Sequence, residues 1–348
     1  MRNNRIVYYG AFVLLLVLMF ALSACGGKSQ ESVSKKIEKQ LTNLEGYKAE
    51  VEMTMNTGKT ERKYDIDIWY QKNEEEDFYR VDLQNEADDH HQTILKNEEG
   101  VFVLTPLLNK SFKFQSDWPE KNGQPYLYQS LIQDIAEDKE ANFTEEEDYY
   151  KYTTKTNYMN SKHLPFQHIY FNKKSYLPMF VQVLGEDEQP LIEVKFTNFE
   201  INPSFAEADF SRESILGEAP GEEADEETVA SDEQVAPMEL LLPVETMGAE
   251  LIETEEVDVD DGTRTIMTFK GDRNFTLIQE HIDVIPAQAT VADDLNGELV
   301  HLGHSIGAVS DGMVSWNYKG TQFYLASKEL TMDELIDVAS SVYGRGVK

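Results

Sequence analysis

The pentapeptide 303–307 (GHSIG) is the pattern that most directly suggests chemistry, because it matches the G-x-S-x-G nucleophile elbow of α/β-hydrolases. An elbow holds its serine between a strand and a helix, and the acid and histidine of the triad follow later in the chain. Here residues 308–312 lead into another turn and strand, and no histidine follows Ser305. We therefore interpret the pentapeptide as a glycine-bounded turn between strands.

Metal chemistry has equally weak support in the sequence. None of the histidines lies in an H-E-x-x-H motif or pairs with a cysteine. Residues 256–262 begin like a calcium loop, but the sixth position is Asp261 instead of glycine and the twelfth is Met267 instead of glutamate. The segment is better explained as a hairpin, and no metal or cofactor is predicted. The histidines are His90, His91, His163, His168, His281, His301 and His304.

Acidic residues are too frequent for any one pair to indicate a glycosidase, which needs two carboxyl groups facing each other across a cleft. With 64 acidic residues, chance placement accounts for most such pairs. The runs 74–77 and 145–148 are typical of solvated loops at strand ends. No catalytic residue is predicted. A hydrolase that uses scattered carboxylates or Ser305 is the least favoured of the three hypotheses for this chain, and the other two follow below.

Cys25 is the one residue with a clear chemical assignment. Arg2 and Arg5 precede an apolar run over 6–24, as in a secretory signal peptide. Residues 22–25 (LSAC) fit the lipobox of bacterial lipoproteins, so cleavage is expected between Ala24 and Cys25, with lipid attached to the Cys25 thiol. An uncleaved transmembrane helix and a free structural cysteine are the alternatives. Lipid attachment would anchor the chain to the membrane, on its outer face.

The composition limits the partners. The chain has 348 residues, 41% of them hydrophobic, which is enough for a sizeable core and roughly two domains. Its formal net charge is -33, and losing Arg2 and Arg5 with the signal peptide makes it -35. Such a polyanion repels phosphate backbones and anionic lipid, so nucleic-acid binding is excluded. A single cysteine also excludes an intrachain disulfide and a cysteine-cluster zinc site.

Hydrophobic periodicity predicts the elements that must position any site. Apolar residues at helical spacing predict helices near 32–44 and 126–138. Strict alternation over 47–55 predicts a strand with one buried and one wet face. The order helix, meander, helix, meander implies a large antiparallel sheet with helices on one face. Further strands are expected near 62–71, 78–84, 91–97, 100–105, 110–115, 149–157, 166–173, 178–185 and 190–199.

An acidic segment divides the chain. Residues 217–236 carry eight acids and no base, so we predict a flexible linker over 213–236 between a domain at 32–212 and a smaller α+β domain at 237–348. A solvated surface loop is the alternative. The second domain should contain a hairpin that turns through residues 260–262 and end in a helix capped by Thr331 that runs to about Tyr343. The expected division is a signal peptide at 1–24, a lipidated tether at 25–31 and these three segments.

Bulky apolar residues along the first domain's strands have two interpretations. They could form an ordinary core beneath the helices, or they could line a hollow between sheet and helices that binds an acyl chain or apolar peptide. Periodicity alone favours the core. The residues that would line such a cavity are Trp69, Phe102, Leu104, Phe112, Phe114, Phe171 and Phe180.

Residues 32–212 resemble the LolA/LolB/RseB superfamily of lipoprotein carriers and sensors, and within it the lipid-anchored YdcC and GerS families of endospore-forming bacteria. The resemblance implies an α+β fold, an incomplete antiparallel β-barrel with a helical lid over an apolar cavity. Residues 237–348 resemble the small domain that follows in two-domain members. The segments that carry the resemblance are 44–47, 68–72, 79–82, 94–102, 196–202 and 208–210.

This resemblance implies a non-catalytic lipoprotein that acts in spore envelope or cortex assembly, or in germination. It would bind an acyl chain or an apolar segment of an envelope or spore-assembly protein, from the outer face of the cell membrane or within the forespore or spore envelope. The alternative is a protein-binding scaffold without a ligand cavity that regulates a peptidoglycan or cortex enzyme through a surface groove.

Overall fold

The computed structural model of the protein describes residues 28–56, 61–85, 90–115, 118–119, 123–159, 162–217, 240–259, 262–281, 293–295 and 297–346. The expected signal peptide at 1–24, Cys25 and residues 218–236 of the expected linker lie outside these ranges. Strands predominate and helices are few, in two large sheets.

The first unit is built on one large sheet, in which twelve strands pair within the described residues. Their order is β16-β6-β5-β4-β3-β2-β1-β11-β10-β9-β8-β7, so the pairing of β1 with β11 joins two meanders. Neighbouring strands are antiparallel except that β16 pairs parallel with β6. The strands are β1 Gly46–Asn56, β2 Glu61–Gln71, β3 Phe78–Asn85, β4 His91–Asn97, β5 Gly100–Thr105, β6 Lys110–Phe114, β7 Asn142–Glu145, β8 Tyr149–Lys155, β9 Phe166–Asn172, β10 Pro178–Leu184, β11 Pro190–Ile201 and β16 Asp293–Leu295.

Alternation along the strands separates an inner from an outer face. In β1, Tyr47, Val51 and Met53 are buried, whereas Glu50 and Glu52 are exposed, as a period of two requires. We call the face with Tyr47 and Val51 the inner face. The expected strand over 47–55 is therefore confirmed, with its predicted orientation.

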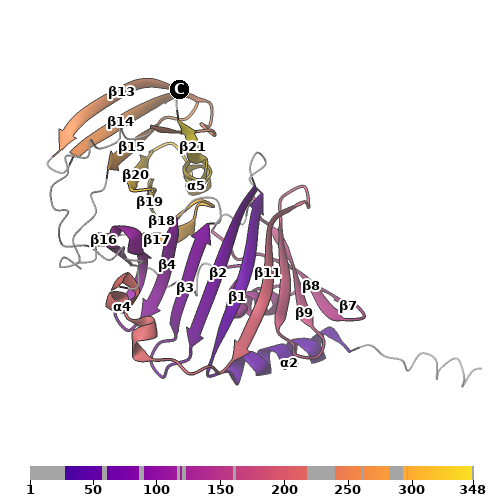
Figure 1. The fold of residues 1–348 in the computed structure, drawn as a ribbon. Helices are drawn as coiled ribbons and strands as arrows, with labels where there is room; N and C mark the ends of the chain where they lie inside the picture. The colour runs from indigo at the N-terminus through magenta and orange to yellow at the C-terminus, as the bar shows by residue number, and fades with distance from the viewer. Residues whose placement is uncertain are drawn as a thin grey trace, which may run out of the picture.

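Two helices pack against the inner face. α2, Gln30–Thr42, begins at the N-cap Ser29 and buries Val33 and Ile37. α3, Tyr128–Glu137, buries Leu131 and Ile135 in the same core. Both helices were expected from their apolar spacing. Figure 1 shows α2 across one end of the strands and the second unit at the other end.

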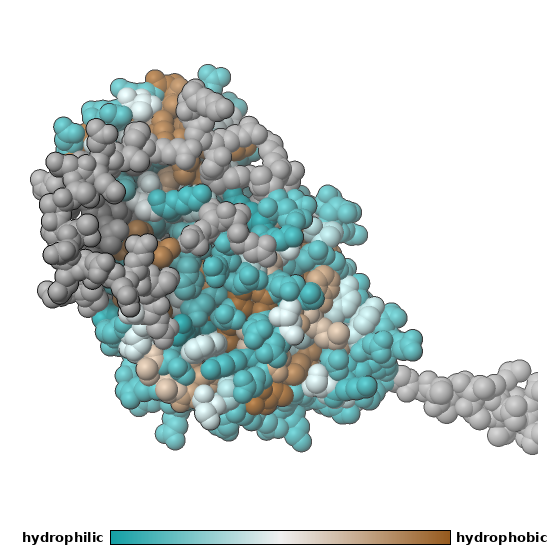
Figure 2. Space-filling view, viewed as in Figure 1, coloured by the Kyte–Doolittle hydropathy of each residue, from teal (hydrophilic) through white to brown (hydrophobic). Residues whose placement is uncertain are grey.

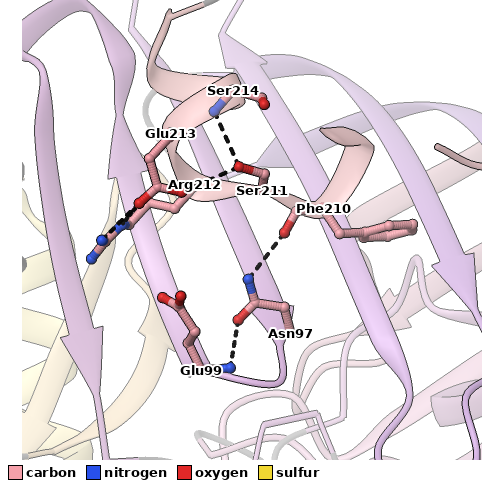
Figure 3. A network of polar contacts seen from close by, with 7 residues as sticks. All are labelled: Asn97, Glu99, Phe210, Ser211, Arg212, Glu213 and Ser214. Atoms are coloured by element: carbon pink, nitrogen blue, oxygen red, sulfur yellow. Dashed lines mark hydrogen bonds and ion pairs between the residues drawn. The ribbon is translucent and has the colours of Figure 1, made fainter. Parts of the chain in front are cut away.

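A short strap covers part of the outer face. It consists of η2, Glu207–Phe210, and α4, Arg212–Gly217. Asn97 on β4 donates through Nδ2 to the Phe210 carbonyl at 3.0 Å, which fastens the strap to the β4–β5 hairpin (Figure 3). The linker was expected from residue 213, but residues 213–217 complete α4 because Ile215 and Leu216 are buried in this outer cluster.

The second unit is a seven-stranded antiparallel sheet, ordered β13-β14-β15-β20-β19-β18-β17 within the described residues, with α5 packed on it. α5, Met332–Ser340, has the expected capping box, since Thr331 and Glu334 exchange side-chain to backbone hydrogen bonds. The helix does not reach Tyr343, because β21, Val342–Gly346, pairs with β12, Leu241–Pro243. The sheet strands are β13 Ala249–Val259, β14 Gly262–Gly271, β15 Phe275–His281, β17 Glu298–His301, β18 Ile306–Ser310, β19 Met313–Tyr318 and β20 Thr321–Ala326.

The two units share a core. Leu299, Ile306 and Ala308 of the second sheet belong to the same buried cluster as the inner face of the first. β16 also extends the first sheet by pairing with β6. The two units are therefore joined both by side-chain packing and by backbone pairing.

The face drawn in Figure 2 is mainly hydrophilic where it is coloured, with apolar residues in separate patches. Among the residues that the structure describes, no helix has the length and apolar character needed to cross a bilayer. The exposed large apolar side chains are Leu107, Phe166, Met179, Ile201, Val244, Leu251, Ile252, Met313 and Met332.

Candidate functional site

The seven residues expected to line a cavity are divided between the two faces of the large sheet, so no single cavity contains them. Phe112, Phe114 and Phe171 belong to the inner core, while Phe102 and Leu104 lie in the outer cluster under the strap, with Trp69 packed against it. Phe180 contacts Tyr170, with ring centroids 5.6 Å apart, on the face opposite to Val181.

β5 shows why sequence reasoning combined residues from both faces. Val101 and Val103 point to the inner core, and Phe102 and Leu104 point to the outer cluster. Arg212 of the strap lies over the Phe102 ring, 5.5 Å from its centroid. Both faces of β5 are thus buried, and an apolar run buried on both sides carries no signal that distinguishes them.

Aromatic side chains fill the inner face. Tyr47, Trp118, Tyr128, Tyr152 and Phe171 are each 0% exposed. The Phe171 ring centroid lies 5.8 Å from that of Tyr152 and 6.4 Å from that of Tyr128. Rings from the sheet and from α3 therefore occupy the space in which a hollow half-barrel would hold an acyl chain.

An apolar pocket remains where the inner face meets the second unit, at the end of β1 away from α2. Its volume is about 70 Å³, which exceeds the roughly 15 Å³ needed for one water but is below the ~300 Å³ of small-molecule sites. Methionine side chains adapt their shape to different apolar occupants. The pocket can therefore accept an apolar side chain. Its walls include Met53, Met55, Met159 and Leu164 of the first unit and Leu299 and Val300 of the second.

The GHSIG segment holds the second unit against this inner face. Ser305 Oγ donates to Gln92 Oε1 at 3.2 Å, and the Ile306 N–H donates to the same oxygen at 2.9 Å. Ser305 is 4% exposed, and the Asn317 carbonyl is a second acceptor within reach of its one hydroxyl proton. Strand β18 begins directly at Ile306, where an elbow would require a helix. The serine is thus a buried structural contact between the units.

The two glycines of the segment have structural roles. Gly303 adopts a φ of 79°, in the left-handed region that glycine tolerates best, and its carbonyl accepts a hydrogen bond from the Tyr64 hydroxyl. A Cβ on Gly307 would lie 2.8 Å from the Ser315 carbonyl oxygen on the neighbouring strand. The G-x-S-x-G spacing is therefore explained by a turn and a close strand approach.

Histidines gather beside the same segment. His304 is 1% exposed, and its ring centroid lies 5.0 Å from that of Tyr318, which also contacts His90 at 5.2 Å. Burial, assisted by the charge of Arg62, lowers the pKa of His301 to about 4 and the pKa of His304 well below its ordinary value. Part of His301 reaches the surface, but its Nε2 is buried. Both histidines are neutral at neutral pH.

A buried carboxyl group that sequence reasoning missed lies behind the pocket. Asp134 on α3 is 4% exposed, and burial raises the pKa of Asp134 to about 7, while a hydrogen bond from Gln167 opposes this shift. The Tyr158 hydroxyl, in the pocket wall, donates to Gln167 Oε1 at 2.8 Å. Asp134 lies beside Ile135 and three residues after Leu131, on the apolar face of α3. A carboxylate among the apolar positions of a predicted helix was the signal in the sequence for this buried group.

The remaining motifs form no site. Within the described part of the chain, no group of three or more histidine, cysteine, aspartate or glutamate residues is placed to hold a metal. The described residues of the calcium-like segment, 256–259 and 262, lie in the paired strands β13 and β14, with Asp258 opposite Thr263. In the run 145–148, Glu145 pairs with Lys173 at 2.7 Å.

Comparison with known proteins identifies the family. The model of the family described as sporulation protein YdcC-like matches residues 9–210. The sporulation protein YdcC of Bacillus subtilis (strain 168) is 41% identical over 343 residues, which cover 97% of this chain and 98% of that protein.

Two solved structures are similar at low identity. One is the complex of Pseudomonas aeruginosa MucA/MucB, at 14% identity, covering 90% of this chain and 100% of that chain with a TM-score of 0.33. The other is the LolA superfamily protein NE2245 from Nitrosomonas europaea, at 10% identity, covering 53% and 98% with a TM-score of 0.29. From the family match and the relative in Bacillus subtilis, this chain belongs to the YdcC-like family of sporulation proteins.

Proposed function

We propose that this protein is a non-enzymatic binding protein of the sporulating cell's envelope, and that its pocket between the two units receives an apolar side chain from a segment of a protein partner. The observation that carries the proposal is the pocket itself. Met53 and Met55 of the first unit and Leu299 and Val300 of the second form its walls, so the pocket depends on how the units meet.

An acyl chain is the less well supported occupant. The space between sheet and helices is filled by side chains such as Trp118, Tyr128 and Phe171, each 0% exposed. The pocket volume of about 70 Å³ is also several times smaller than the ~300 Å³ at which small-molecule sites begin. A single side chain, presented by a protein, matches this volume better.

The orientation of the protein at the membrane is inferred from the expected lipid on Cys25. α2 begins at Gln30, five residues after Cys25, so the helical end of the large sheet would face the membrane. The second unit lies at the other end of the strands (Figure 1), and the pocket lies between it and the first unit. A partner would then be bound on the side away from the outer face of the cell membrane.

Site-specific photo-cross-linking in sporulating cells tests the occupant. A benzophenone amino acid at Met55, in the pocket wall, should yield a protein adduct, and the same group at Met179, which is 38% exposed on β10 and does not line the pocket, should not. Adducts with only a lipid mass at Met55 would establish the acyl-chain alternative. Equal adducts at Met55 and Met179, or none, would contradict the pocket as the binding site.

Native mass spectrometry gives an independent measurement. Residues 26–348, purified without detergent, should show the mass of the chain alone and remain unchanged when fatty acid is added. A bound mass in the lipid range that disappears in Met55→Trp, which fills the pocket, would overturn the protein-partner assignment.

The scaffold function remains the second candidate, and the packed inner face favours it. A scaffold of this kind would bind an envelope enzyme through its surface and need no pocket. A stable complex that is retained in Met55→Trp would support this function over the first.

A further inference from the structure

Strand β13 forms an open edge of the second sheet. It lies at one end of the strand order and pairs with β14 on one side within the described residues. Its residues from Glu250 to Glu256 are all exposed, so this strand contributes little to the core. Figure 1 shows the β13–β14 ribbon at the end of the molecule away from α2. Among the described residues, no strand pairs with its other edge, which is therefore open to a further strand.

The edge is strongly acidic. Glu253, Glu255, Glu256 and Asp258 lie within six residues, and β13 contains no basic residue. Arg264 on β14 is already paired with Glu280 at 2.9 Å. No ion pair joins the four carboxylates to a base within the described residues. Because side chains alternate, two of these acids face each side of the sheet.

Charge determines which strand could add to this edge. A second copy of the chain would place its own β13 acids opposite these, and like charges directly across a strand pair are unfavourable. Many natural edges are short or bulged, which prevents pairing. β13 has a bulge at Ile252, but residues 253–259 beyond it pair regularly with β14 over about 23 Å, at roughly 3.3 Å per residue. A partner strand of similar length therefore has a regular edge available.

We propose that β13 binds an extended segment of another protein, rich in lysine or arginine on both of its faces, as an added strand. Backbone hydrogen bonds along 253–259 would provide the pairing, and the carboxylates of Glu253, Glu255, Glu256 and Asp258 would select basic partners. This surface is separate from the pocket of the proposed function and does not depend on it.

The test uses the full chain and a fluorescein-labelled synthetic peptide, VKKTKKV, in an anisotropy titration at 0.15 M salt. Glu253→Lys/Glu255→Lys/Glu256→Lys should weaken binding by about tenfold or more, since three opposite-charge contacts become repulsive. The matched control Glu74→Lys/Glu75→Lys/Glu76→Lys makes the same charge change in an exposed loop and should alter the affinity by less than about twofold.

A second peptide separates strand pairing from simple charge attraction. The same sequence, N-methylated at every peptide nitrogen, keeps its charge but has no backbone N–H to donate to a neighbouring strand, and it should lose most of its affinity. Equal binding of both peptides, equal losses in both triple variants, or no binding of VKKTKKV to the unmodified chain would each overturn the proposal. Thermal unfolding of both triple variants confirms that they remain folded.

Discussion

The inner and outer faces of the large sheet are both apolar in part, but they are covered in different ways. The inner face meets α2, α3 and the second unit, and its aromatic side chains are fully buried. The outer face is covered around Phe102 and Leu104 by a strap of two short helices, whereas Phe180 remains half-buried. On the outer face, the amount of covering chain decides how deeply a phenylalanine is buried, since Phe102 lies under the strap and Phe180 does not.

This difference has a functional consequence. A half-barrel whose helices stand away from the sheet can hold a ligand between them, whereas here the inner face serves as the main core of the molecule. Space remains where the second unit meets β1, at Met53 and Met55. Binding is therefore expected at the junction of the units.

Two phenylalanines on neighbouring strands give the largest expected contrast. Phe171→Ala should lower the free energy of unfolding by about 3–5 kcal/mol, because it leaves a cavity among rings on the inner face. Phe180→Ala, on the outer face, should cost less than about 1 kcal/mol because the side chain is half-buried. Urea unfolding followed by circular dichroism measures both. Similar losses in the two variants would show that the faces are equally packed.

Gln92 tests the contact between the inner face and the second unit. Gln92→Ala leaves the Ser305 hydroxyl without one of its acceptors and the Ile306 N–H without its side-chain acceptor, and should cost about 1–3 kcal/mol in urea unfolding. Gln84→Ala, on an exposed position of the adjacent strand, should stay within about 0.5 kcal/mol of the parent chain. If both variants unfold like the parent, the hydrogen bonds to Gln92 do not join the units.

The strap on the outer face should show a smaller and local effect. Asn97→Ala removes both the hydrogen bond to the Phe210 carbonyl and the turn hydrogen bond that Asn97 Oδ1 accepts from the Glu99 N–H, and should cost about 1 kcal/mol. Hydrogen exchange should then become faster for backbone amides in 207–217. Asn73→Ala removes a comparable turn hydrogen bond to the Glu74 N–H without touching the strap, so exchange in 207–217 should be unchanged. Faster exchange in both variants would contradict a role for Asn97 in fastening the strap.

Histidine protonation should affect the junction only below neutral pH, so this effect is the smallest at pH 7. The pKa of His301 in the folded chain is about 4, below the ordinary value of 6.5, and the pKa of His304 is also lowered. The unfolded chain therefore binds more protons between pH 6.5 and 4, and stability falls as the pH falls through this window. His301→Gln/His304→Gln should lose less stability than the parent between pH 7 and 5, measured by urea midpoints. An identical pH dependence in both chains would show that these histidines do not contribute to the loss of stability at low pH.

Local pattern was sufficient for most elements of the fold. The helices near 32–44 and 126–138, the first-domain meander and the β13–β14 hairpin all follow from periodicity and turn residues, and the structure contains them. Short elements were not predicted, among them β7 Asn142–Glu145, β16 Asp293–Leu295 and α4. Such short segments are stabilised by the elements they pair with or cover, and their own residues give little signal.

The candidate site was less accessible to sequence reasoning. The expected cavity residues were chosen for size and apolarity, which do not separate Val101 from Phe102 when both sides of a strand are covered. The buried Asp134 and the methionine-lined pocket were missed. Their surroundings combine segments that are distant in the chain, as when Gln167 on β9 reaches Asp134 on α3.

The sequence by itself determined the order of strands and helices, the alternation of their faces and the family to which the chain belongs, because these are encoded in residues that are neighbours or share a local period. Tertiary structure alone decided which side of a doubly apolar strand such as β5 joined the inner core, where space remained and what Ser305 does. The Ser305 hydroxyl meets Gln92 across 213 residues of chain, and no local pattern specifies a contact of that range. Only the packing of the second unit onto the inner face brings these two side chains together.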